Sequence, residues 1–288
     1  MKLSRLILSD LKQNITSKGF SGCLLLTALL CFTANLYYDS SAKNQYSVIQ
    51  CIFEFDRDFM LKDITFCAEN IIAGFVQGFF TMFVPILSAF VFIPVFSEER
   101  QSKYIRYSIF RMSKNTYYCG KFLSSVLSSG IAITAGFILF SLLVYILFPH
   151  FDEYPDYLQN MAAIYFGSGV FGGVLLKFLS VFIFGMLYAV PSLMFFSMIK
   201  NRYLIICIPF FLKYALTQTI TKINLNEALS PQPNNDLLNI CGIIFPDNLL
   251  TIFYYGNLAG VLIYSAILFI LGFILYFAFM RRRTDCGC

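Results

Sequence analysis

The sequence predicts an all-α membrane protein with six transmembrane helices, and three observations carry that prediction. First, 58% of the 288 residues are hydrophobic and 13% are charged, whereas soluble domains carry roughly 25% charged residues. Second, the apolar residues are gathered in blocks of about twenty, the length that crosses a bilayer. Third, the basic residues collect between alternate blocks. We expect a single transmembrane domain over residues 1–288 in contact with membrane lipid, and no nucleic-acid partner.

The chain begins with an amphipathic pattern over residues 1–18. Leu3, Ile7, Leu11 and Ile15 recur every four residues, which places them on one face of a helix, while neighbouring basic residues can reach lipid phosphates. We expect a helix lying along the inner membrane face, or alternatively a basic leader before the first span. A secretory signal is disfavoured because the next apolar run is long and lacks a small-residue cleavage site.

Six apolar blocks give the expected spans, which lie at about residues 20–37, 71–96, 122–148, 174–199, 203–220 and 258–280. The second span contains Pro85 and Pro94, which a membrane helix tolerates when its neighbours satisfy the freed carbonyls. The third span carries a stripe of small residues that lets another helix approach closely; it comprises Ser125, Ser129, Ala132 and Gly136.

The charges orient these spans. Most of the 21 basic residues lie before the first span, between the second and third, at residues 200–202 and after the last span. Short loops rich in Lys and Arg stay in the cytoplasm, so we expect a cell-membrane protein with both termini cytoplasmic. Residues 39–70 and 221–257 are then extracytoplasmic. Within the latter, Pro246, Asp247 and Asn248 interrupt an apolar stretch, which predicts a broken, re-entrant segment.

No nucleotide-binding or catalytic motif is present in the sequence. The Gly120-Lys121 pair has Asn115 where a P-loop needs its first glycine and Phe122 where it needs Ser or Thr. The sequence contains no GxSxG or HExxH motif, and His150 is its single histidine. We therefore expect no enzyme activity, no metal and no cofactor in this chain.

Four polar residues inside or near the spans are candidates for a substrate pathway. Lys213 is the strongest, because charges inside a membrane mark functional sites; Thr217 and Gln218 follow it, and Gln77 lies in the second span. The alternative is that they hold helices together by hydrogen bonds. Lys177, near the outer start of the fourth span, is expected to snorkel to the headgroups.

Cys51 and Cys67 share the first outer loop. A disulfide between them is expected if the loop faces an oxidising compartment, and two free thiols are expected in a reducing one.

The longest charged run, residues 97–121, separates the second and third spans. Ser97 is expected to cap a short amphipathic helix over residues 98–111, with Glu98 and Glu99 in its first turn. Ser113 is expected to cap a second helix that runs directly into the third span. The alternative for the first helix is an interfacial segment resting on lipid.

Two glutamates leave the second span, a basic stretch follows, and Ser113-Lys114, Tyr117 and Lys121 enter the third. This arrangement resembles the coupling-helix region of ABC-2 type transporter permeases. The family is similar in layout over the whole chain, with an N-terminal amphipathic helix, six spans, cytoplasmic termini and broken outer helices. The local motif departs from the family pattern: Ser102 or Lys103 replaces a common glycine, and Arg111-Met112-Ser113 replaces a Pro-Ser-Arg type turn.

The resemblance implies the membrane-spanning permease subunit of an ATP-driven exporter in a bacterial cytoplasmic membrane, moving a peptide, lipid-like or drug-like substrate. Such a permease pairs as a homodimer or heterodimer and receives cytoplasmic ATP-binding subunits, which hold the ATP and Mg. The residues that would couple to that partner are Glu98, Glu99, Arg100, Lys103, Arg106, Arg111 and Lys114. Two alternatives are an ATP-independent immunity or binding protein and an ion-gradient-driven transporter, which would need buried acids that the expected spans lack.

Overall fold

A computed structural model describes residues 2–39, 43–74, 78–102, 112–155, 170–199, 201–229, 235–244, 246–251 and 258–285. Its longer helices are α1 (Lys2–Ile15), α2 (Lys18–Cys31), α6 (Phe79–Gln101), α8 (Lys114–Leu147), α10 (Val170–Met198), α11 (Arg202–Leu229) and α13 (Leu258–Asp285). Shorter elements are β1 (Asn35–Asp39), β2 (Asn44–Ser47), α3 (Val48–Glu54), α4 (Arg57–Met60), η1 (Ile64–Phe66), α5 (Ala68–Gly74), η3 (Phe151–Glu153), α12 (Asn235–Ile244) and η4 (Pro246–Thr251).

Within these described residues, five helices are long and apolar enough to cross a membrane, and the bent pair α1–α2 makes a sixth if it is counted as one span. The prediction of a helical membrane protein is confirmed at this level, with a count of five to six crossings. The small β1–β2 hairpin is an addition to the expected all-α fold.

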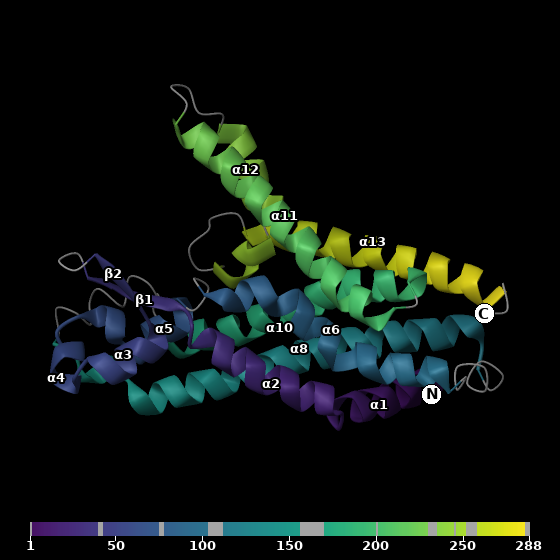
Figure 1. Cartoon of the computed structure of the whole chain (residues 1–288), viewed down its shortest axis with the longest axis horizontal. Coiled ribbons are helices and arrows are strands. Elements are labelled where there is room, and N and C mark those ends of the chain that lie inside the picture. Colours follow the sequence, from purple (N-terminus) through teal and green to yellow (C-terminus); the bar gives the residue numbers. More distant parts are fainter. Residues whose placement is uncertain are drawn as a thin grey trace.

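Helix α8 is the central element of the bundle. It packs against α1, α2, α6 and α10, and both chain termini lie at one end of the bundle while the β1–β2 hairpin lies at the other (Figure 1). The predicted stripe of small residues on α8 is buried. At Gly136 a Cβ atom would stand 2.6 Å from the carbonyl oxygen of Leu24, so the absence of a side chain there allows α2 to approach.

The first predicted span differs from the structure. Helix α2 ends at Cys31 instead of continuing to residue 37, and the chain turns into β1. Its 14 residues extend about 21 Å, which is less than the ~30 Å of a bilayer core. Helix α1 precedes α2, with a bend of 62° between them, and the two helices together are long and apolar enough to count as one span.

The second predicted span is divided. Helix α5 ends at Gly74, and α6 begins at Phe79 and continues to Gln101, beyond the expected end at residue 96. Ser97 is therefore inside α6, where its hydroxyl donates to the Pro94 carbonyl 3.2 Å away, and it caps no new helix. The expectation for Ser113 is confirmed, because its hydroxyl accepts from the Thr116 amide at the start of α8.

Residues 39–70 form more structure than the expected polar loop. The antiparallel β1–β2 pair, α3, α4 and η1 surround a cluster of rings contributed by Tyr37, Tyr46, Phe55, Phe59 and Phe66, with centroids 4.8 to 6.4 Å apart. Phe66 is fully buried in this cluster. The aromatic residues therefore give this segment a small core of its own.

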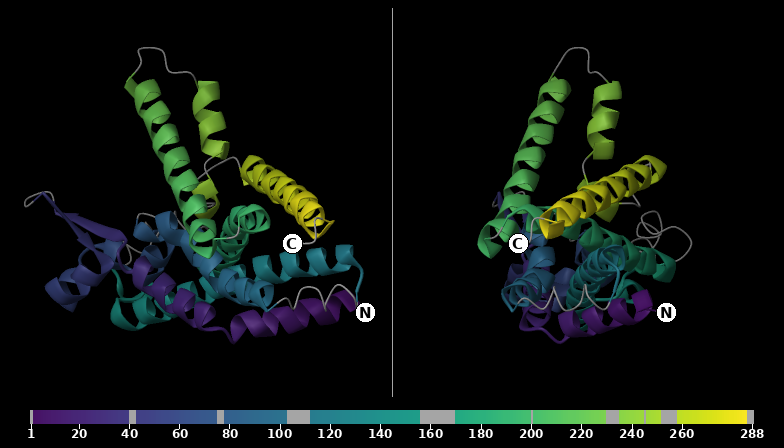
Figure 2. Two further views of the ribbon diagram at one scale, coloured as in Figure 1. Left: turned by 45° about the vertical axis from the view of Figure 1, so that its right-hand side comes forward. Right: turned by 90° about the vertical axis from the view of Figure 1, so that its right-hand side faces the viewer.

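Helices α11 and α13 are the least covered parts of the bundle. Helix α11 extends past its expected end at residue 220, and the hairpin that it forms with α12 projects away from the other helices (Figure 2). Large apolar side chains of α11, such as Phe211 and Leu212, are more than half exposed. After α12 the chain returns through η4, where the predicted interruption at Pro246 and Asp247 is found.

Candidate functional site

A buried ion cluster joins three helices near the end of the bundle where the termini lie. The ammonium of Lys121, on α8, lies 3.0 Å from a carboxylate oxygen of Asp10 on α1 and 2.8 Å from one of Glu99 on α6. The side chains of the three residues are at most 8% exposed. Lys121 also faces the ring of Phe96 at 5.0 Å. We call Asp10, Glu99 and Lys121 the inner ion cluster.

Helix α1 brings Asp10 to the cluster because it packs on α8 through polar side chains. Asp10 and Asn14 are one turn apart on α1 and are both buried; the Asn14 amide donates to the Ser128 hydroxyl of α8 at 3.1 Å. The face of α1 that contacts α8 is thus partly polar. The expectation of a helix lying along the membrane surface did not include these buried polar contacts. The cluster has two carboxylates for one ammonium, and the second oxygen of Asp10 has no hydrogen-bond partner.

The residues expected to couple to an ATP-binding partner fall into different environments. Glu98 and Lys114 are exposed. Glu99, which the family resemblance places with Glu98 at the hinge of the coupling segment, is buried in the inner ion cluster. Arg100 turns back onto the bundle, since its guanidinium donates to the Ile199 carbonyl at 3.2 Å. The other three, Lys103, Arg106 and Arg111, lie outside the described residues.

A second charged cluster lies in the other half of the bundle. The ammonium of Lys213, on α11, is 2.8 Å from a carboxylate oxygen of Asp247 in η4 and also donates to the Thr81 carbonyl of α6. The Tyr188 hydroxyl of α10 donates to the same oxygen of Asp247 at 3.3 Å. Lys213 stands 4.6 Å from the centre of the Tyr188 ring and 5.3 Å from that of Phe184. Four elements therefore meet at this pair.

A cavity of about 220 Å³ adjoins this pair between α10, α11 and α13. Its wall is mostly apolar, with polar groups from Tyr188, Lys213, Thr217 and Tyr264. Of the predicted pathway residues, Lys213 and Thr217 line it. Gln218 is exposed and is not among its lining residues, and Gln77 lies outside the described residues.

Lys177 does not snorkel as expected. Its side chain is buried, and its ammonium donates to the Ala73 carbonyl of α5 at 2.8 Å and to the Leu250 carbonyl of η4. These two carbonyls lie near the ends of short helices, where backbone acceptors lack partners. Lys177 thus links α5 and η4 to α10.

Cys51 and Cys67 are both free thiols in buried positions, so the structure contains no bridge between them. Burial raises the pKa of each thiol to about 12. Cys67 also donates to the carboxylate of Glu69 at 2.9 Å, and proximity to that negative charge opposes ionisation further.

Sequence reasoning missed Asp247 and Asp10 as partners of buried lysines. Asp247 follows a proline in a broken segment and was interpreted as a helix interruption. The available signal for Asp247 was the presence of Lys213 in an apolar stretch, because a buried ammonium requires an acid or several carbonyls nearby. Lys121 lies at the end of the charged run 97–121, which gives no such signal for Asp10.

No protein-family model matches this chain, and no curated protein sequence matches it. The functional assignment therefore depends on the geometry of the two clusters and the cavity.

Proposed function

We propose that the chain is the membrane-spanning permease subunit of an ATP-driven exporter. One observation carries the proposal: the inner ion cluster fastens the last turn of α6 to the first turns of α8 and to α1. The basic segment between residues 102 and 113 connects these two helices. A partner that displaces this segment would therefore act on three helices at once.

The energetics of the cluster support such a role. Removing one member of a buried ion pair typically costs 3–5 kcal/mol because it leaves an uncompensated charge. Helices joined in this way move together more readily than they separate. Exposed Glu98 and Lys114 stand at the two ends of the basic segment and provide charges for an ATP-binding subunit to contact. In this proposal ATP and Mg bind to that partner subunit.

The cavity beside Lys213 supports a substrate role. Ligand sites in proteins are mostly apolar with a few converging polar groups, and this cavity has that composition. At about 220 Å³ it is smaller than the roughly 300–1,000 Å³ of sites for drug-sized ligands. It would therefore accommodate one apolar group of a larger peptide or lipid-like substrate.

The proposal is tested by reversing a charge at the basic segment. Glu98→Lys is expected to abolish the ATP-dependent uptake of substrate into inverted membrane vesicles, which corresponds to export in the cell. The variant protein is still expected to insert into the membrane. The matched control is Glu54→Lys, which changes an exposed acid at the opposite end of the bundle and is expected to leave export unchanged. Normal export by the Glu98→Lys variant would contradict the coupling role.

A transporter driven by an ion gradient is the second candidate, and the buried Lys213–Asp247 pair favours it. Buried acids carry protons or ions in such proteins. A protonophore separates the two candidates: it stops gradient-driven transport and spares transport that depends on ATP.

A further inference from the structure

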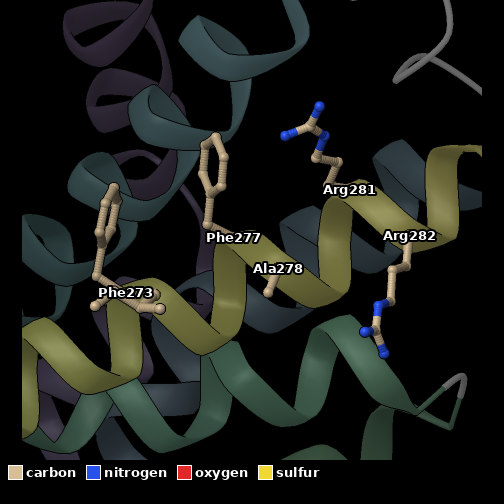
Figure 3. A pocket seen from close by; sticks show the side chains of 6 residues that line it. Phe273, Phe277, Ala278, Arg281 and Arg282 are labelled. Carbon is tan, nitrogen blue, oxygen red and sulfur yellow. The ribbon is translucent and has the colours of Figure 1, made fainter.

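A groove of about 490 Å³ runs along α13 near its C-terminal end. Its lining residues are Phe273, Ile274, Phe277, Ala278, Arg281 and Arg282, and we call it the α13 groove. Figure 3 shows the rings of Phe273 and Phe277 on the side of α13 that faces a neighbouring helix. Phe273 lies 5.0 Å from Phe122, and Phe277 lies 6.0 Å from Tyr118. These contacts hold the two rings against α8.

The charge in the groove is confined to one end. Arg281 and Arg282 follow the apolar residues by one turn, and both are exposed. Their side chains leave α13 in different directions (Figure 3), so that two guanidinium groups flank the end of the apolar surface. No acidic side chain is among the described residues that line the groove. The groove is therefore apolar along most of its length and carries two arginines at one end.

The position of the groove matches that of a lipid at the membrane surface. The C-terminal end of α13, which carries Arg281 and Arg282, lies at the end of the bundle where both termini are found (Figure 1). The apolar part extends from there along α13 toward the middle of a helix whose mean hydropathy suits the bilayer core. A ligand bound here would have its polar group at the surface and its apolar group in the hydrocarbon.

We propose that the α13 groove binds an anionic membrane phospholipid. The lipid phosphate binds a guanidinium group at the end of the groove, since the planar guanidinium groups of Arg281 and Arg282 suit bidentate phosphate contacts, and one acyl chain lies along the apolar residues of the groove. Basic pockets beside membrane helices at the cytoplasmic membrane surface recognise anionic headgroups. A zwitterionic lipid fits less well because its own cation offsets the phosphate charge. This site is separate from the basic segment and from the cavity beside Lys213, and it does not depend on the proposed transport function.

The test uses the full chain purified in mild detergent and native mass spectrometry to count bound lipids. Phosphatidylglycerol and phosphatidylcholine with the same acyl chains are added separately at equal concentration. We expect phosphatidylglycerol to be retained more strongly, by on the order of tenfold or more, since each basic residue near a membrane surface contributes about 1 kcal/mol to anionic-lipid attraction. Equal retention of the two lipids would overturn the proposal.

Three variants separate the parts of the site. The double variant Arg281→Gln/Arg282→Gln is expected to lose the preference for phosphatidylglycerol, whereas Arg202→Gln, an exposed arginine at the start of α11 outside the groove, is expected to keep it. Ala278→Trp fills the apolar part from an exposed position and is expected to weaken retention while both charges remain. Retention that survives both the double variant and Ala278→Trp would overturn the site, as would displacement of the lipid by millimolar inorganic phosphate, which would indicate a site for free anions.

Discussion

The ammonium of Lys121 lies 2.8 Å from the carboxylate of Glu99 although both side chains are more than nine-tenths buried. Lys121 is near the start of α8, and Glu99 is in the last turn of α6. The pair therefore joins the two helices close to the ends of the basic segment that connects them. Asp10 brings α1 to the same ammonium. This is the contact on which both the stability and the proposed coupling of the protein depend.

Replacing Lys121 by methionine should destabilise the protein strongly. The change keeps most of the side-chain volume but leaves two buried carboxylates without a cation, and losses of this kind are about 3–5 kcal/mol. Thermal unfolding in detergent measures the effect. The control Lys12→Met removes an exposed lysine from α1 and is expected to leave the Tm nearly unchanged, and an equally small shift for Lys121→Met would show that the cluster does not hold the helices.

The Lys213–Asp247 pair should behave as a coupled unit. Lys213→Met and Asp247→Asn each leave one buried partner unpaired, so each is expected to lower the Tm, whereas the double variant is expected to recover part of the loss. Additive losses in the double variant would indicate that the two residues act independently, against the 2.8 Å contact.

Cys51 and Cys67 should resist alkylation in the folded protein. Because burial raises the pKa of both thiols to about 12, almost none of the reactive thiolate is present at pH 8, whereas an ordinary cysteine with a pKa of about 8.5 is partly ionised there. Peptide mapping by mass spectrometry after treatment with iodoacetamide is expected to show modification of these positions after denaturation only. Rapid labelling of Cys51 or Cys67 in the native protein, or a mass that rises by two hydrogens on reduction, would contradict the free, buried thiols; exposed Cys207 serves as the internal control for labelling.

The close packing of α2 on α8 predicts a large effect at Gly136. In Gly136→Ala the new methyl group would lie 2.6 Å from the Leu24 carbonyl and from the Thr27 Cβ, and the strain of overpacking is typically 1–3 kcal/mol. Gly172→Ala is the matched helical control, since no atom lies within 4 Å of the added carbon. Equal Tm values for the two variants would argue against the α2–α8 contact.

The local features of the fold were accessible from the sequence, and the long-range ones were not. The apolar block of α8 and the cap at Ser113 depend on neighbouring residues, and both are found as predicted. The turn after Cys31 was missed because Phe32, Leu36 and Tyr37 prolong the apolar run past the end of α2. The ring cluster that Tyr37 joins is formed with residues later in the chain, such as Phe55 and Phe66.

The candidate site was predictable only in part for the same reason. Lys213 was identified as a buried charge from the apolar residues around it, but its partner Asp247 is 34 positions away. Lys121 and Asp10 are separated by 111 positions, and one sequence has no pattern that pairs them. Glu99 was expected in the first turn of a new helix; the continuation of α6 by one more turn places it inside the bundle instead.

The most direct measurement of the central proposal is the identification of what binds the chain in its native membrane. The tagged protein is purified from its own host in a mild detergent, beside the Glu98→Lys and Glu54→Lys variants, and the co-purified proteins are identified by mass spectrometry. A permease of an ATP-driven exporter should bring with it a P-loop ATPase, in comparable amounts for wild type and Glu54→Lys and in reduced amount for Glu98→Lys. Recovery of the intact wild-type protein without any P-loop ATPase would contradict the proposed function.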